Sequence, residues 1–404
     1  MATFPECSTR SVRRNYLGAI KRVFLLRPHP SDQVSTMMKS TMRRYAISNV
    51  LAASFSLALS VPSHAQISLA PPSTPCPVYK SPGVQEHITA AVRLADHDLP
   101  PTLIPELFNI PRRAGLCAPE QVPSPKIDDS GSTAVKAFDQ LYYIGSNFVG
   151  AWVLSTKDGL ILFDTMWSTD DAVNIIEPGM HKFGLNPADI KYIVMTHGHV
   201  DHWGGAKYFQ DKYHPRLLMG GADWALTEKG MPSTVRTGHP HADPPARGMD
   251  ITDGQTLSLG GTTVRLFITP GHTPASMAAI FPVTDRGAPH LAGLFGGNGL
   301  PLHLEKSIGP DGLETDAGLL AYIASVKRFA TLGHAAGVDV AISTHPGFDG
   351  SIANAEKISH RGPNDPNPWV LGKDRWSRYM QVQLEVAETV KAMETEHPVA
   401  ARGP

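Results

Sequence analysis

Hydrophobic and polar positions alternate along this chain with two different periods. Helical spacing of apolar residues predicts helices over 84–98, 171–183, 204–213, 222–229, 313–332 and 373–394. Short apolar runs bounded by turn residues predict strands over 137–144, 150–155, 160–163, 190–195, 216–219, 255–259, 263–268, 277–281, 292–295 and 338–342. Because strands and helices alternate in both halves, we expect an α/β fold with sheet inside and helices outside.

The pattern also divides the chain into parts. Residues 66–130 form a Pro-rich extension that ends in the Ser/Pro/Asp-rich linker 123–132. We expect the main domain over 131–358 and a C-terminal helical extension over 359–404 that packs on the same domain.

Residues 1–65 have the three-part pattern of a secretory signal peptide. Basic residues precede the apolar run 50–61, and Ser63-His64-Ala65 supplies a small-x-small site. The run is shorter than the roughly 20 residues of a membrane span. We therefore expect cleavage after Ala65, export to the periplasm or the medium, and no stable membrane span afterwards. An uncleaved anchor or a disordered tail is the alternative.

Charge and cysteine usage change with that cleavage. Residues 1–65 carry nine Lys/Arg and two Asp/Glu, which leaves 27 basic and 35 acidic residues elsewhere. An acidic remainder argues against a nucleic-acid partner and favours a small-molecule substrate. Cys76 and Cys117 remain as an even pair in an oxidising compartment, so we predict a disulfide between them, with two free thiols as the alternative.

Side chains able to bind a metal are concentrated in the segment Thr196–His202. It reads Thr-His-Gly-His-Val-Asp-His and directly follows a predicted apolar strand. Three imidazoles and one carboxylate within six residues suit zinc, or less often iron or manganese. Together with more distant ligands they exceed what one tetrahedral ion can use. The segment therefore indicates two neighbouring metals, as found in hydrolases.

Two further histidines follow predicted strands in the same way. His272 lies in Thr269–Thr273, after the strand 263–268, and His345 lies in Ser343–Gly347, after the strand 338–342. Chemistry in α/β folds gathers beyond such strand ends. We therefore expect both histidines to join the 197–202 cluster.

These three motifs resemble those of the metallo-β-lactamase superfamily over roughly residues 135–358, and Asp164 matches the family's structural aspartate before the first helix. The resemblance implies an αββα sandwich, here with N-terminal and C-terminal extensions. It implies two Zn²⁺ ions and a metal-bound hydroxide as nucleophile. The implied ligands are His197, His199 and His272 for the first ion, and Asp201, His202 and His345 for the second.

The same resemblance gives roles to residues around the ligands. Asp164 is expected to support a ligand rather than bind metal, and Asp201 is also a candidate to orient the attacking hydroxide. Many relatives carry a bridging aspartate where this chain has Asn298. His202 is present, and His199 replaces the glutamate of the flavodiiron relatives. The pattern is most similar to the third, His-rich subclass of metallo-β-lactamases.

The resemblance implies a hydrolase whose leading substrate class is a β-lactam-type cyclic amide. A metal-dependent lactonase, esterase or other amide hydrolase is the first alternative, and an iron-dependent redox or sulfur-oxygenating enzyme is the second. A non-catalytic zinc module would leave open coordination positions unused. Residues proposed for the substrate pocket are Trp203, Asn298 and His303.

Overall fold

Residues 133–251 contain the strands of one sheet. The computed structural model describes residues 82–103, 129–228, 242–301 and 315–396. Within them, a seven-stranded sheet runs in the order β1 to β7, antiparallel from β1 to β4 and parallel from β4 to β7. Its strands are β1 (Thr133–Lys136), β2 (Leu141–Gly145), β3 (Gly150–Thr156), β4 (Gly159–Phe163), β5 (Ile190–Val194), β6 (Arg216–Gly220) and β7 (Met249–Ile251).

Residues 256–342 contain the strands of the second sheet. Five described strands lie in the order β12-β11-β10-β9-β8, antiparallel except for the parallel pair β11 and β12. These strands are β8 (Thr256–Leu259), β9 (Thr262–Ile268), β10 (Met277–Asp285), β11 (Ala288–Phe295) and β12 (Val340–Ile342).

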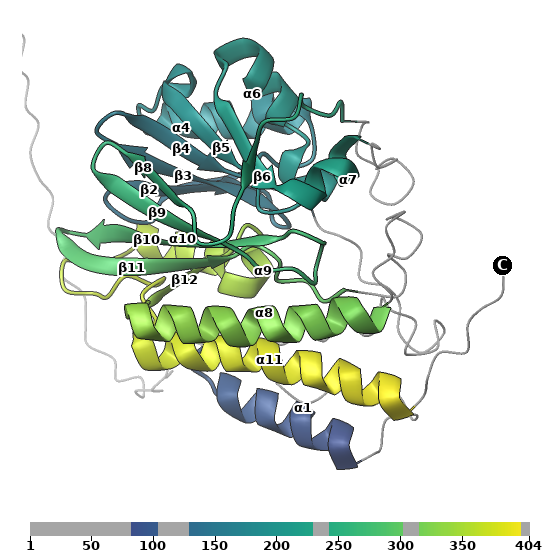
Figure 1. Cartoon of the computed structure of the whole chain (residues 1–404). Coiled ribbons are helices and arrows are strands. Elements are labelled where there is room, and N and C mark those ends of the chain that lie inside the picture. The colour runs from purple at the N-terminus through teal and green to yellow at the C-terminus, as the bar shows by residue number, and fades with distance from the viewer. Residues whose placement is uncertain (1–81, 104–128, 229–241, 302–314, 397–404) are drawn as a thin grey trace, which may run out of the picture. The chain divides into compact units, whose positions relative to one another are not determined.

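Helices connect the strands and cover the outer faces of both sheets (Figure 1). The short segment α3 (Thr169–Asp171) continues through a π-helical turn (Ala172–Ile176) into α4 (Glu177–Lys182). The remaining described helices are α1 (Pro82–Ala95), α5 (Val200–Trp203), α6 (Ala206–Tyr213), α7 (Trp224–Glu228), α8 (Thr315–Ala336), α9 (Pro346–Asp349), α10 (Ser351–Ser359) and α11 (Lys373–Glu396). Single 3₁₀ turns span Pro187–Asp189 and Gly221–Asp223.

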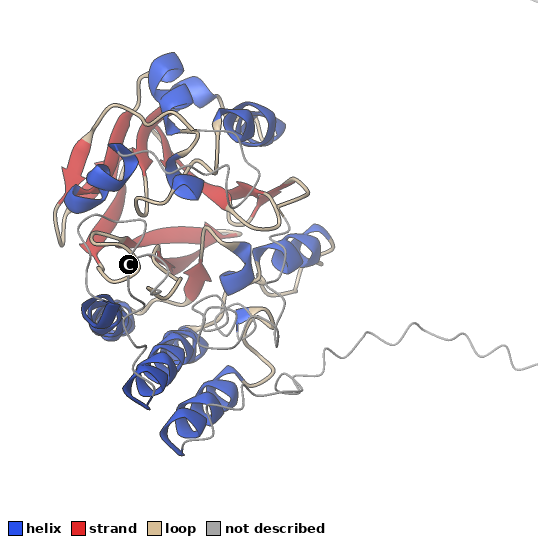
Figure 2. Cartoon of the chain, turned by 90° about the vertical axis from the view of Figure 1, so that its right-hand side faces the viewer, coloured by secondary structure: helices blue, strands red, loops and turns tan. Residues whose placement is uncertain are grey.

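The main core lies between the two sheets. Phe163 of β4 stacks on Phe281 of β10, with ring centroids 5.2 Å apart. Separate apolar clusters join β1–β6 to α4 and α6, and the second sheet to α8 and α11. Figure 2 shows the two sheets between these helices. The predicted αββα sandwich is therefore confirmed.

Helices α8, α11 and α1 lie one beyond the other on the second sheet (Figure 1). His87 of α1 is 2.7 Å from Glu385 of α11. Arg378 of α11 donates to the Leu94 carbonyl at 2.9 Å and to Asp98 at 2.6 Å. These contacts show that the described part of the N-terminal extension braces the helix layer.

The predicted strand over 137–144 is wrong in its boundaries. A turn separates β1 from β2, and the Asp139 carboxylate accepts hydrogen bonds from the amides of Arg286 and Gly287 in the β10–β11 turn. Asp139 in the β1–β2 turn therefore contacts the β10–β11 hairpin instead of continuing a strand. Strands β1 and β7 and helices α5, α9 and α10 were missed, and β10 and β11 extend beyond their predicted ends up to that same turn.

Several predictions concern residues outside the described ranges. These are the signal peptide with its cleavage after Ala65, the Cys76–Cys117 disulfide and the pocket position of His303. Among the described residues, no helix combines the length and the apolar character that crossing a membrane requires.

Candidate metal centre

The first part of the site is the connection that leaves β5. This strand lies between β4 and β6, and the chain turns after it before α5 begins at Val200. His197 lies in the turn, and His199 has extended backbone at the N-terminus of α5. Asp201 and His202 lie within α5 and are buried. One short turn therefore directs all four side chains to the same end of the sheet.

The second part comes from the loop between β9 and β10. Gly271 has φ +136°, and a Cβ there would lie 2.4 Å from the Tyr322 backbone of α8. Only glycine allows this close approach without strain. The next residue, His272, is thereby directed towards the 197–202 turn.

The third part follows the edge strand β12. His345 precedes α9, and its turn is held by β3, because the Gly150 amide donates to the Thr344 carbonyl at 2.7 Å. The Trp152 indole donates to the Ser343 carbonyl at 2.8 Å. Contacts between the sheets therefore fix where this histidine lies.

The structure brings the six expected ligands together in two groups. His197, His199 and His272 form one group, and Asp201, His202 and His345 form the other. In each group the three potential ligand atoms lie within 4.8 Å of one another. Each group combines two residues that follow β5 with one from the second sheet.

The spacing within the groups suits a shared ion. The Nε2 atoms of His197 and His272 are 3.1 Å apart, as are those of His202 and His345. The Asp201 Oδ2 atom lies 3.4 Å from His202 Nε2 and 3.5 Å from His345 Nε2. Tetrahedral zinc with Zn–N bonds of about 2.0–2.1 Å sets ligand atoms about 3.3–3.4 Å apart. Imidazole and carboxylate donors at this spacing fit zinc.

Several of the imidazoles have a partner on the nitrogen that faces away from the group. His202 Nδ1 is 2.6 Å from Asp164, whose carboxylate also accepts from the amide and hydroxyl of Thr196. His345 Nδ1 is 2.9 Å from the Phe148 carbonyl, and His197 Nδ1 is 3.0 Å from the Thr196 hydroxyl. Such partners fix the ring orientation and leave Nε2 free to bind metal.

Burial keeps four of the histidines neutral. It lowers the pKa of His199 and of His345 to about 4, and it lowers the pKa of His197 and of His272 well below the usual range. Neighbouring histidines add to this effect in each case. Neutral imidazole is the form that binds metal, so these residues need not release a proton first.

His202 and Asp201 have the opposite environment. Burial alone would lower the pKa of His202, but the carboxylates of Asp201 and Asp164 outweigh it and raise this pKa to about 10. Burial disfavours the ionised form of Asp201, yet His202 and His345 outweigh it and hold this pKa well below its usual range. Without an ion, the second group therefore contains an imidazolium between two carboxylates.

The structure corrects the expectation for Trp203. Its side chain is fully buried, and its indole donates to the Gly198 carbonyl at 2.9 Å. It therefore supports the turn that carries His197 and His199, and it offers no surface to a substrate. Asn298 is also buried, with its side-chain amide 2.7 Å from the Ser343 hydroxyl.

Sequence reasoning missed three residues next to the two groups. The half-buried Phe148 ring lies edge-on to His345, with centroids 4.9 Å apart, and stacks on Trp167 at 5.7 Å. Asp223 and Asp349 are buried carboxylates that accept hydrogen bonds from the ligand-bearing loops. No local motif marks these residues, because their partners are distant in sequence or belong to ordinary turns.

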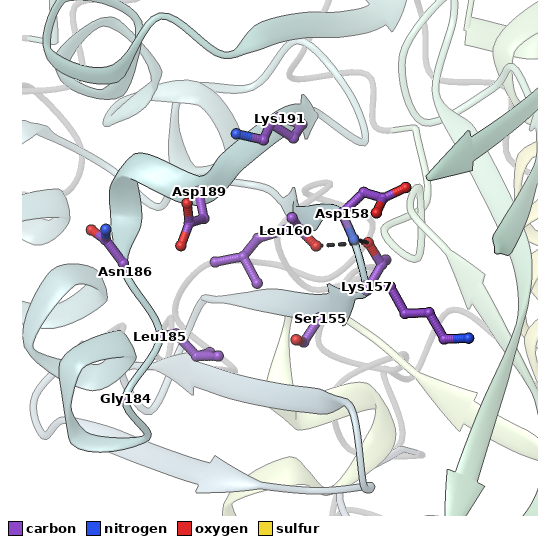
Figure 3. Close-up of a pocket in the computed structure, with 11 residues that line it drawn as sticks. Ser155, Lys157, Asp158, Leu160, Gly184, Leu185, Asn186, Asp189 and Lys191 are labelled. Atoms are coloured by element: carbon purple, nitrogen blue, oxygen red, sulfur yellow. Dashed lines mark hydrogen bonds between the residues drawn. The ribbon is translucent and has the colours of Figure 1, made fainter. Parts of the chain in front are cut away.

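A surface pocket at the other end of the first sheet is separate from this site (Figure 3). It is lined by the β3–β4 turn around Asp158 and by the residues before and within β5, including Asp189 and Lys191. The ligand groups lie beyond the opposite ends of the same strands. The pocket therefore has no part in the metal centre.

Comparisons with known proteins agree with this architecture. In solved structures, the chain is similar to a subclass B3 metallo-beta-lactamase of Bradyrhizobium japonicum, with 24% identity, a TM-score of 0.54, and 66% and 97% of the two chains covered. It is also similar to a metallo-beta-lactamase from Legionella gormanii, with 18% identity, a TM-score of 0.53, and 65% and 96% covered. At these identities the likeness defines the fold.

The family follows from the sequence comparison. Residues 145–284 match the metallo-beta-lactamase superfamily, and this part of the chain is a domain of that superfamily. A probable polyketide biosynthesis zinc-dependent hydrolase of Bacillus velezensis is 26% identical over 143 residues, covering 35% of this chain and 53% of the relative. A hydroxyacylglutathione hydrolase of Prochlorococcus marinus is 26% identical over 137 residues, covering 33% and 47%. The chain thus spans about half the length of these relatives.

Proposed function

We propose that this protein is a zinc-dependent hydrolase with two Zn²⁺ ions, one in each group of three ligands. The main support is the close spacing of the three potential ligand atoms within each group. Each group offers three side chains at tetrahedral spacing, which leaves further positions for water and substrate and is typical of catalytic zinc. A structural site would use four protein ligands.

When bound, the two ions lower the pKa of water to near 7 and stabilise the charge that develops on a leaving group. The residues of the chain supply the geometry. Asp164 holds His202 in the tautomer that presents Nε2, and the Phe148 carbonyl does the same for His345. Asp201, one of the three members of the second group, also orients the attacking water towards a substrate carbonyl.

We propose a β-lactam-type cyclic amide as the substrate. Two features support this choice: the likeness in fold to β-lactamases, and the presence of Asn298 where many relatives carry a bridging aspartate. A thioester, ester or lactone is the second candidate, because hydroxyacylglutathione hydrolases are among the curated relatives.

Steady-state assays of the zinc-loaded protein separate these candidates. We expect a chromogenic cephalosporin to be hydrolysed, with turnover lost in His345→Ala and after chelation. Turnover of a lactone or thioester without cephalosporin turnover would instead assign the second candidate. If none of these substrates is hydrolysed by protein that holds two zinc ions, the hydrolase proposal fails.

Elemental analysis tests the choice of metal. We expect close to two zinc per chain in protein purified without added metal. Iron in place of zinc would favour the redox or sulfur-oxygenating alternative. His199 argues for zinc, because its neutral imidazole takes the position of a carboxylate ligand in the iron relatives.

We also propose that the mature protein is exported. The support is the basic start, apolar run and small-x-small site of residues 1–65. N-terminal sequencing of protein recovered from a bacterial periplasm or medium should begin at Gln66. Full-length protein retained inside the cells would contradict export.

A further inference from the structure

Two buried aspartates lie behind the ligand groups and have no part in the proposed chemistry. Asp223 ends the 3₁₀ turn after β6, and Asp349 ends α9. Asp223 is 0% exposed to solvent and Asp349 is 2% exposed. A buried carboxylate is costly unless hydrogen bonds compensate it, so the donors around each aspartate indicate its role.

Asp223 joins the two loops of the first group. One oxygen, Oδ2, accepts from the Gly198 amide at 2.9 Å and from the Thr273 hydroxyl at 2.5 Å. The other, Oδ1, accepts from the Ala275 amide at 2.7 Å. Gly198 lies between His197 and His199, and Thr273 follows His272. One carboxylate therefore sets the separation of all three ligands of the first group.

Asp349 holds the turn that carries His345. Its Oδ2 atom accepts from the Ser343 amide at 2.8 Å and from the Ser351 hydroxyl at 2.7 Å, and Oδ1 accepts from the Ser351 amide at 2.9 Å. The Ser343 hydroxyl in turn accepts from the His345 amide at 3.1 Å. The Asp349 carboxylate thus links the backbone before His345 to the backbone after it.

An amide cannot replace either carboxylate. Each aspartate receives a backbone N–H on both of its oxygens, whereas asparagine has a single acceptor oxygen. Whichever way the amide is turned, its NH₂ group faces one N–H, and that buried donor loses its acceptor. Aspartate-to-asparagine variants therefore change the hydrogen bonds while hardly changing the volume.

We propose that Asp223 and Asp349 are positioning residues that act separately, Asp223 on the first zinc site and Asp349 on the second. This inference rests on the proposed binding of two zinc ions. It goes further by assigning each site its own support, outside the six ligands. The two affinities should therefore be adjustable one at a time.

Single-site backgrounds allow each affinity to be measured alone. His345→Ala leaves the first group complete, and His272→Ala leaves the second group complete. Asp223→Asn and Asp349→Asn are each introduced into both backgrounds. Zinc affinity is then measured by competition with a chromophoric chelator, without any need for turnover.

The expected result is a crossed pattern. Asp223→Asn should weaken zinc binding about 10- to 100-fold in the His345→Ala background, the usual effect of losing a group that supports a ligand, and should leave the His272→Ala background unchanged. Asp349→Asn should do the reverse. The matched control is Asp285→Asn at the far end of β10, which breaks the ion pair with Arg361 and should leave both affinities unchanged.

Equal weakening of both sites by either variant would overturn the proposal, because it would indicate general destabilisation. Unchanged affinity in all four double variants would also overturn it. Failure of the proposed function looks different: in that case a single-site background without any aspartate change would bind no zinc. Circular dichroism of each metal-free variant identifies any that has not folded, and Asp223→Ser and Asp349→Ser then serve as second variants.

Discussion

At the scale of single residues, charge at the site is set by what lies behind the ligands. His202 lies between Asp164 and Asp201, and both carboxylates raise its pKa. In the other imidazoles burial outweighs any nearby carboxylate, and they remain neutral. Asp164 is therefore the residue whose loss should change the second site most without removing a ligand.

We expect Asp164→Asn to weaken zinc binding at the second group about 10- to 100-fold, because His202 loses the carboxylate that orients it. Asp164 has φ +60°, a conformation that asparagine also tolerates, so the backbone should be kept. Chelator competition measures the affinity. Asp158→Asn, in the exposed β3–β4 turn, is the control, and equal affinities in the two variants would refute the role of Asp164.

Asp349 should make stability depend on pH. Burial raises its pKa to about 7, so the folded state holds this proton more tightly than the unfolded chain does. Its contribution to stability is complete below pH ~4 and is lost as the pH rises through 7. Between pH ~5 and ~8 the metal-free protein should lose about 3 kcal/mol relative to Asp349→Asn, whose amide does not titrate. Urea unfolding at both pH values measures the difference, and parallel pH profiles would contradict it.

The meeting of these six residues in two groups could be predicted from the sequence, because each lies in a motif that directly follows an apolar strand. The residues that hold them could not. Asp223 binds amides 25 and 52 positions away, and His345 uses a carbonyl 197 positions away. Such pairs arise only once the two sheets have packed, and no local period or composition records them.

At the scale of elements, the ligand loops depend on close backbone packing. The loop after β9 reaches its position because Gly271 lies against α8. The alternation of apolar residues predicted the strands around this loop well. Strand ends were less predictable where polar residues such as Asp139 contact a distant hairpin, because the pattern there resembles an ordinary turn.

Gly271→Ala should displace the loop from α8 and lower zinc binding at the first group, since a Cβ would lie 2.4 Å from backbone atoms of Tyr322. Thermal unfolding should show a loss of more than about 2 kcal/mol. Gly254→Ala is the matched control, because Gly254 also has a positive φ of +77° but no atom within 4 Å of the added Cβ. It should cost only about 1 kcal/mol. Equal losses in the two variants would argue against the packing explanation.

At the scale of the whole molecule, the site forms where two differently built sheets meet. The parallel half of the first sheet ends in the 197–202 turn, and the second sheet contributes one loop to each ligand group. The α1–α11–α8 layer covers the outer face of the second sheet and leaves the site to the strand ends. Stability and metal binding should therefore be coupled through the contact between the sheets.

Removing the metal should lower both activity and thermal stability. With free zinc a thousandfold above its dissociation constant, each site adds about 4 kcal/mol to the folded state. Calorimetry should then show a drop in the unfolding midpoint on the order of 10 °C after chelation. Zinc should restore the midpoint and turnover together, whereas magnesium should not. An unchanged midpoint would show that the ligand groups do not bind zinc tightly.

Each ligand group takes two side chains from the 197–202 turn and one from the loops of the second sheet. Neither half of the polypeptide therefore completes either group on its own. Cut in the turn around Asp253, between β7 and β8, the chain would give two fragments that share both ions. Zinc would then hold the two fragments together, and the fraction of reassembled protein would rise with the zinc concentration.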